Sequence, residues 1–320
     1  MRIPKAFICG VAGARLRDEE KLFLAEHQPY GVILFARNCL DPEQVRDLTH
    51  EIYDCLSHPY AGILIDQEGG RVARLKPPHW PAFPAAAHFA RCYADNSPQA
   101  ERDTYENARA IAAMLKSHGI TINCAPLADV PSAECHDVIG DRAFGDSPEQ
   151  VAILARAQAN GLHDGGVLSV LKHIPGHGRA VADSHLELPV VKASRNDLER
   201  IDFAPFRALN DLPLGMTAHI LYTALDAARV ATLSPIVIDV IRRDIGFDGL
   251  LMSDDISMKA LKGSMAQLSQ ATLDAGCDLV LHCNGVMKEM REIASVVPEM
   301  RVVSLMRAER ADALLRSKAA

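Results

Sequence analysis

The stretch PEQVAILARAQANGL (residues 148–162), with VLSVL (167–171) and KHIPGHG (172–178) after it, contains the unit that repeats along this chain. Its first part has the apolar spacing of an amphipathic helix, and its second part is a short apolar run typical of a buried strand. The third part is a polar loop rich in glycine. Strands that are joined through helices run parallel, so this unit predicts an α/β protein.

About eight such units follow one another. The predicted strands lie at residues 6–9, 32–35, 63–65, 121–124, 167–171, 214–217, 250–252 and 279–281. The predicted helices lie at residues 42–56, 101–117, 148–162, 196–209, 235–243 and 267–275, and a last helical stretch, 302–318, is expected to pack across the barrel. Asp41 is expected to cap the first helix, and Gly161 is expected to end the third. This count favours a closed (β/α)8 TIM-type barrel over an open sheet. Because no Pro/Ser-rich linker interrupts the pattern, we expect residues 1–320 to form a single catalytic barrel domain.

Composition and charge narrow the class of protein. The 320 residues carry a net charge of −7 with no run of Lys and Arg, which argues against nucleic acid and anionic membranes as partners. The eight cysteines are scattered without a C-x-x-C pair, so we expect reduced thiols. The apolar run at residues 6–14 is broken by Gly10 and Gly13 and is interpreted as a first strand rather than a signal peptide. No apolar run approaches the roughly 20 residues that span a bilayer, and we expect a cytoplasmic monomer.

Unusual polar residues come directly after the predicted strands. They are Asp66, Glu68 and Arg71 after the third strand, Asp129, Asp141 and Arg142 after the fourth, Lys172, His173, His177, Asp183 and His185 after the fifth, His219 after the sixth, and Asp254 and Asp255 after the seventh. The carboxyl ends of barrel strands meet at one face, where barrel enzymes hold their active sites. The pattern therefore indicates an enzyme.

Simpler roles compete for several of these residues. Either Asp254 or Asp255 can cap a following helix, but two adjacent carboxylates cannot both do so. The glycines at residues 69–70 predict a tight turn and lack the spacing of a phosphate-binding loop. His173 and His177 lie in an irregular loop, so they are not a metal pair on one helix face. We expect neither a metal nor a cofactor.

Seven motifs stand in order along the chain: GVILFARN (31–38), IDQEGGRVAR (65–74), APLADV (125–130), IGDRAF (139–144), KHIPGHGRAVADSH (172–185), TAHI (217–220) and GFDGLLMSDDISM (246–258). Together they resemble the β-N-acetylglucosaminidase branch of glycoside hydrolase family 3. The resemblance covers most of the chain, and its KH-x-PGHG and DSH pattern is highly specific. It implies a retaining β-N-acetylhexosaminidase that releases terminal N-acetylglucosamine from muropeptide fragments in cell-wall recycling.

The resemblance also implies roles for individual residues. Asp254 matches the nucleophile that forms a glycosyl-enzyme intermediate, which leaves Asp255 as the expected cap. His185 matches the acid/base, with Asp183 orienting its ring, because an imidazole titrates near neutral pH.

The substrate-binding positions that the resemblance implies are Asp66, Arg74, Arg142, Lys172 and His173. We expect Arg71 to be a structural partner for a neighbouring carboxylate.

Three alternatives stay open at this point. A phosphorylase on the same barrel would transfer the sugar to phosphate. A metal-dependent hydrolase would use Asp66, His173, His185 and Asp254 as ligands, although their spacing is not helical. A non-catalytic sugar-binding barrel would need neither a nucleophile nor a proton shuttle, and both are present in the sequence.

Overall fold

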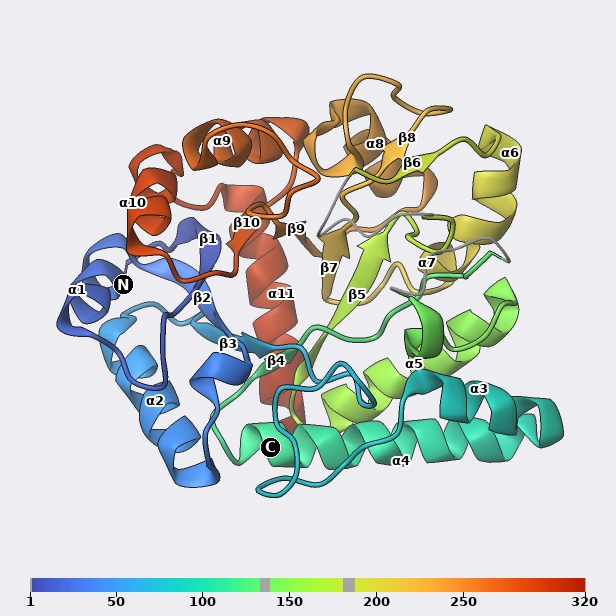
Figure 1. Ribbon diagram of the computed structural model, residues 1–320, viewed down its shortest axis with the longest axis horizontal. Helices are drawn as coiled ribbons and strands as arrows, with labels where there is room; N and C mark the ends of the chain where they lie inside the picture. Colours follow the sequence, from blue (N-terminus) through green and yellow to red (C-terminus); the bar gives the residue numbers. More distant parts are fainter. Residues whose placement is uncertain (1, 133–138, 181–187, 320) are drawn as a thin grey trace.

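The computed structural model describes residues 2–132, 139–180 and 188–319. Eight parallel strands close into a barrel in the order β1-β10-β9-β7-β5-β4-β3-β2, with helices around them (Figure 1). They are β1 (Lys5–Gly10), β2 (Pro29–Leu34), β3 (Gly62–Ile65), β4 (Ile122–Asn123), β5 (Leu168–Ile174), β7 (Leu214–Thr217), β9 (Leu250–Asp255) and β10 (Leu279–His282). Each overlaps one predicted strand, so the prediction of a closed (β/α)8 barrel is confirmed.

The helices on the first half of the barrel and at the end of the chain are regular. They are α1 (Asp18–His27), α2 (Pro42–Cys55), α3 (Ala86–Asp95), α4 (Ser97–Lys116), α5 (Pro148–Asp164), α9 (Met265–Ala275), α10 (Met287–Val296) and α11 (Val302–Ala319). Short 3-10 turns, η1 (Ala36–Asn38), η2 (Gly140–Arg142) and η4 (Ala231–Leu233), and a small sheet of β6 (Val190–Val191) and β8 (Leu221–Tyr222) complete the loops. Three of these helices, α1, α3 and α10, were not predicted from the sequence.

Two predicted helices are broken. The helix expected at residues 196–209 consists of α6 (Arg195–Asp197), the π-helical η3 (Leu198–Asp202) and α7 (Ala204–Ala208). Pro205 has no N–H to continue the ladder, which ends the preceding segment and starts α7. The helix expected at residues 235–243 is α8 (Pro235–Asp239) followed by the π-helical η5 (Val240–Asp244).

Helix ends confirm one sequence signal and correct another. Asp41 caps α2, and its Oδ1 accepts hydrogen bonds from Glu43 N (3.0 Å) and Gln44 N (2.9 Å). Gly161 was expected to end its helix, but α5 continues to Asp164. The glycine is needed for packing instead, because a Cβ there would lie 2.2 Å from the carbonyl oxygen of Tyr105 in α4.

Helix α11 packs across the amino ends of the strands, as expected, and Figure 1 shows it behind the barrel. Asp278, directly before β10, is fully buried and accepts from Ser304 Oγ (2.6 Å) and Arg307 Nη1 (3.0 Å). Arg307 Nη2 also donates to Asp248, two residues before β9, at 2.7 Å. These bonds fix α11 at the end of the barrel opposite to the strand carboxyl ends.

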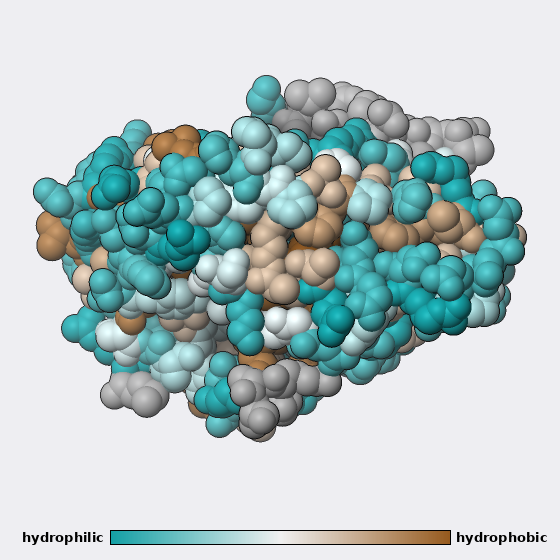
Figure 2. All heavy atoms as spheres, turned by 90° about the horizontal axis from the view of Figure 1, so that it is seen from below, coloured by the Kyte–Doolittle hydropathy of each residue, from teal (hydrophilic) through white to brown (hydrophobic). Residues whose placement is uncertain are grey.

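The strands supply a largely buried core, and every residue of β3, β5, β7 and β10 is buried. The face seen from below in Figure 2 is mainly hydrophilic, with some apolar residues gathered near its middle. Within the described ranges, the cysteines form no disulfide. In the same part of the chain, no helix has the length and apolar character to cross a membrane.

Candidate active site

A cavity of about 170 Å³ opens at the carboxyl ends of the barrel strands. Its polar lining residues are Asp66, Arg74, Arg142, Lys172, His173, His177, Asp254 and Asp255. Six of the eight predicted site residues are therefore brought together here from four different loops or strand ends. The other two, Asp183 and His185, lie outside the described residues.

Asp66 follows β3 and lies between two cations. Its Oδ1 is 3.1 Å from Lys172 Nζ, and its Oδ2 is 2.9 Å from Arg74 Nη2. Burial acts to raise the pKa of Asp66, but the two cations outweigh it and hold that pKa below its usual value. The Arg74 guanidinium also lies over the ring of Phe35, 5.1 Å from its centroid. Asp66 is thus a carboxylate fixed by two cations, of a type that can accept hydrogen bonds from hydroxyl groups.

Glu68 bonds Lys172 as well as one further cation, Arg142, and was not among the predicted site residues. Its oxygens bond Arg142 in a bidentate pair, at 2.9 Å to Nε and 2.8 Å to Nη2, and Oε1 lies 2.6 Å from Lys172 Nζ. Burial disfavours all three charges, yet mutual attraction prevails: the pKa of Glu68 is lowered, and the pKa values of Arg142 and Lys172 are raised. The sequence placed Glu68 in the third loop but gave no sign that it holds Arg142, which is 74 residues away.

A third buried carboxylate, Asp129, holds two histidines, one at the end of β5 and one in the loop after it. Asp129 Oδ2 is 2.8 Å from His173 Nδ1, and Oδ1 accepts from the backbone N–H of His177 at 2.6 Å. Burial, followed by the nearby His173, lowers the pKa of His177 to about 4. His177 is therefore neutral near pH 7. Asp129 was quoted as a polar residue after the fourth strand, but its role depends on a contact that only the fold creates.

The two adjacent carboxylates at the end of β9, Asp254 and Asp255, have different surroundings, and Asp255 is not the helix cap that was expected. Asp255 caps no helix, because β9 extends through it and α9 begins at Met265 under its own cap, Ser264. Asp255 instead shapes the turn: Oδ1 accepts from Ser257 N (3.0 Å), and Oδ2 accepts from Ser257 Oγ (2.8 Å). Asp254 is partly exposed in the cavity, and its Oδ1 accepts from the N–H of Asp255 at 2.8 Å.

Two residues from the sequence predictions lie beside the cavity lining. Arg71 pairs with Asp141 at 2.7 Å, which confirms its expected role as an ion-pair partner. His219 is fully buried, and its Nε2 lies 2.9 Å from the backbone oxygen of Asp255. His219 thereby supports the end of β9 from behind and does not line the cavity.

The family model for the N-terminal domain of glycosyl hydrolase family 3 matches residues 3–314. The chain belongs to glycosyl hydrolase family 3. The β-hexosaminidase of Alkalilimnicola ehrlichii is 38% identical over 305 residues, which cover 92% of this chain and 87% of that protein. The resemblance stated from the seven motifs is therefore confirmed.

Solved structures of family 3 agree with this assignment. NagZ from Neisseria gonorrhoeae, in complex with N-trifluoroacetyl-D-glucosamine, superposes with a TM-score of 0.88 at 32% identity and covers 99% of both chains. A family 3 β-N-acetylglucosaminidase from a Paenibacillus strain gives a TM-score of 0.87 at 29% identity, covering 98% of this chain and 61% of its own. This family 3 chain is a glycoside hydrolase of the β-hexosaminidase type.

The family 3 cavity has the chemistry of a site for a neutral, hydroxyl-rich ligand. Its carboxylates can accept hydrogen bonds from hydroxyl groups, and its cations can donate to hydroxyl or amide oxygens. Across the ranges that the structure describes, no three His, Cys, Asp or Glu side chains are grouped as metal ligands.

Proposed function

We propose that this chain is a retaining exo-β-N-acetylglucosaminidase that removes terminal N-acetylglucosamine from muropeptide fragments in the cytoplasm during cell-wall recycling. In this proposal residues 1–320 act as one catalytic domain, as a monomer and without a metal or cofactor. The observation that carries it is the cavity in which Asp254 faces the ion-paired group of Asp66, Lys172 and Arg142. The complex of the Neisseria relative with a glucosamine derivative supports an amino sugar as the ligand.

Asp254 is the proposed nucleophile. A carboxylate oxygen attacks C1 of the sugar while the bond from C1 to the leaving oxygen breaks, which gives a covalent glycosyl-enzyme. Two facts favour Asp254 over its neighbours: Asp66 is committed to two cations, and both oxygens of Asp255 bond the turn at Ser257. Asp254 lies near the end of β9, before the loop, so the barrel strand holds its carboxylate rigidly.

His185, oriented by Asp183, is the proposed acid/base. It first donates a proton to the leaving oxygen. It then accepts a proton from the water that attacks C1, and the ester bond between C1 and Asp254 breaks. The carboxylates of Asp66, in the cavity, and of Glu68, directly behind it, have lowered pKa values, and His177 has a pKa of about 4, so none of these three carries this proton near pH 7. His173 is the imidazole that competes for the role.

Turnover and product analysis test the reaction. The purified protein is expected to hydrolyse an aryl β-N-acetylglucosaminide far faster than the matching β-glucoside, and NMR should detect the β-anomer of N-acetylglucosamine first. The same product is expected with inorganic phosphate present. A preference for the β-glucoside would refute the proposed substrate, and the sugar 1-phosphate as product would show a phosphorylase.

The catalytic residues are tested separately. A 5-fluoro analogue of the activated glycoside should trap a sugar on the peptide that contains Asp254, which mass spectrometry locates. Replacement of His185 by Ala should slow substrates with poor leaving groups far more than a dinitrophenyl glycoside, because only poor leaving groups need protonation. If His173→Ala shows that pattern and His185→Ala does not, the acid/base assignment is wrong.

A further inference from the structure

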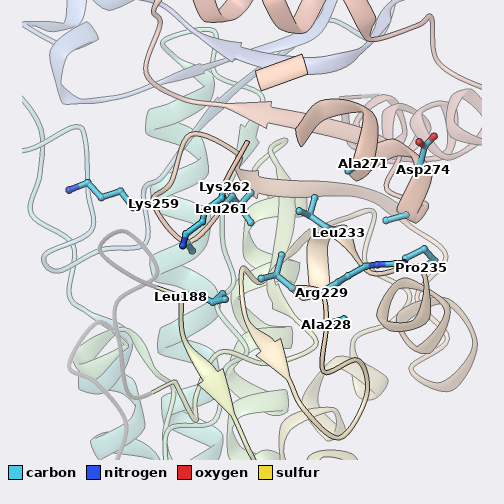
Figure 3. A pocket seen from close by; sticks show the side chains of 13 residues that line it. Leu188, Ala228, Arg229, Leu233, Pro235, Lys259, Leu261, Lys262, Ala271 and Asp274 are labelled. Carbon is cyan, nitrogen blue, oxygen red and sulfur yellow. The ribbon is translucent and has the colours of Figure 1, made fainter. Parts of the chain in front are cut away.

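A groove of about 790 Å³ lies on the outside of the barrel wall, between the turn after β9, the segment of η4 and α8, and helix α9 (Figure 3). We call it the α9 groove. Its lining is largely apolar and includes Leu233, Leu261 and Ala271. Leu188, at one side of it, is 37% exposed. The candidate active site does not use these residues.

The α9 groove shares one segment of chain with the catalytic cavity. Asp255 and Met258 line the cavity, and Lys259 and Leu261 line the groove. The N–H of Leu261 donates to the carbonyl of Met258 at 3.1 Å, so this segment is a tight turn with one hollow on each side. The cavity and the α9 groove are therefore adjacent along residues 258–261.

Three cations stand around the apolar lining. Arg229, Lys259 and Lys262 are all exposed. Figure 3 shows Lys259 and Lys262 toward the side of Leu188, and the Arg229 side chain across the groove, toward Pro235. The described lining residues include one carboxylate, Asp274, which accepts from Gln270 of its own helix at 2.9 Å. This local excess of positive charge stands out in a chain with a net charge of −7. Such a surface attracts an anionic ligand that also carries apolar groups.

We propose that the α9 groove binds the leaving group of the substrate, and that its cations select leaving groups that bear carboxylates, such as a peptide attached to the second sugar. This inference rests on the proposed function. The cavity binds the neutral N-acetylglucosamine, which has no charge to distinguish one substrate from another. Discrimination among substrates then falls to the groove, through Arg229, Lys259 and Lys262.

The test compares two substrates on the full-length enzyme. One is a 4-nitrophenyl β-N-acetylglucosaminide, which is neutral and short; the other is N-acetylglucosaminyl-muramyl dipeptide, whose leaving group carries carboxylates. The variant Arg229→Ala/Lys259→Ala/Lys262→Ala should lose roughly tenfold or more in kcat/KM on the acidic substrate, mainly through KM. Its kcat/KM on the aryl substrate should stay within about twofold of wild type. Higher salt should weaken turnover of the acidic substrate alone.

A matched control removes three exposed cations from outer helices, as Arg46→Ala/Arg102→Ala/Lys288→Ala, and should leave both substrates unaffected. Equal loss on the acidic substrate in the control and the groove variant would overturn the proposal, and so would unchanged kcat/KM in the groove variant. If the groove variant keeps its kinetics but changes its oligomeric state in sedimentation, the groove is an interface between copies of the chain. That result would also overturn the proposal. A wild-type enzyme that is inert on the aryl substrate would instead refute the proposed function, which separates the two failures.

Discussion

Arg142 forms a bidentate ion pair with Glu68 through hydrogen bonds of 2.9 and 2.8 Å, although the two residues are 74 positions apart in the sequence. Both side chains are almost completely buried, so the pair is geometrically fixed. Because Glu68 also bonds Lys172, one carboxylate sets the positions of two cations that line the cavity. Glu68 does not itself line the cavity, which makes it a positioning residue.

Replacement of Glu68 by Gln should therefore reduce activity and stability together. The variant leaves two buried cations with too little negative charge, so we expect a loss of about 3–5 kcal/mol in the free energy of unfolding. Misplacement of Arg142 and Lys172 should lower kcat/KM on the aryl substrate by about 100-fold. Urea unfolding and steady-state kinetics measure the two effects. Asp141→Asn, which breaks the exposed pair with Arg71, is the control and should cost less than about 1 kcal/mol; an equal effect of both variants would contradict the role of Glu68.

The adjacent carboxylates at the end of β9 should differ sharply in their contribution to rate. Asp254→Ala should remain folded and lose on the order of 10⁴-fold in kcat. Asp255→Asn should keep most of its kcat and lose thermal stability, because Asp255 bonds the turn at Ser257 and the backbone N–H of Cys283. Comparable kcat losses in the two variants would refute this division of roles.

His177 should make stability depend on pH below neutrality. Its folded pKa of about 4 lies below its ordinary value near 6.5, so the neutral form that folding requires is fully present above about pH 6.5. This contribution is lost as the pH falls from 6.5 toward 4, by up to about 3 kcal/mol. Urea unfolding at pH 7.5, 6.0, 5.0 and 4.5 should show a shallower decline for His177→Gln than for wild type. The exposed His88 supplies a control, since His88→Gln should follow the wild-type curve; parallel curves for all three proteins would rule out His177 as the source.

Two glycines should respond in opposite ways to the same substitution. Gly161→Ala should destabilise the fold by about 1–3 kcal/mol, because the new methyl group would lie 2.2 Å from the Tyr105 carbonyl and 2.8 Å from the Ala108 Cβ. Gly13→Ala should be neutral or stabilising, because no atom lies within 4 Å of its Cβ position. Thermal unfolding of the two variants checks the prediction, and a stable Gly161→Ala protein would show that α4 and α5 can separate at this point.

The sequence predicted the strands well because each barrel strand is a short apolar run with distinct flanks. Their order and the placement of polar residues after them were sufficient to predict one catalytic face. The helices were harder to predict: a proline inside an apolar pattern, Pro205, broke one of them, and a packing glycine, Gly161, imitated a helix end. The two errors have opposite causes: the local effect of Pro205 on the helix was overlooked, whereas Gly161 was given a local role although it serves packing against α4.

The candidate site shows a similar limit. Residues that match a motif, such as Asp66 and Lys172, were identified individually, whereas Glu68 and Asp129 were not given roles. Their functions consist of contacts with residues 44 to 104 positions away, and no local pattern records such contacts. The turn formed by Asp255 was mistaken for a helix cap because a cap and a turn use the same carboxylate in nearly the same way.

The cation and carboxylate group around Asp66 has a consequence for kinetic experiments. The pKa values of Asp66 and Glu68 are pushed down while those of Lys172 and Arg142 are pushed up, so all four charges stay constant across the range in which enzymes are usually assayed. The sugar binding that we propose for the groups lining the cavity should therefore change little with pH. A bell-shaped dependence of rate on pH in this enzyme would then report the pKa values of the nucleophile and the acid/base, and not those of the groups that bind the substrate.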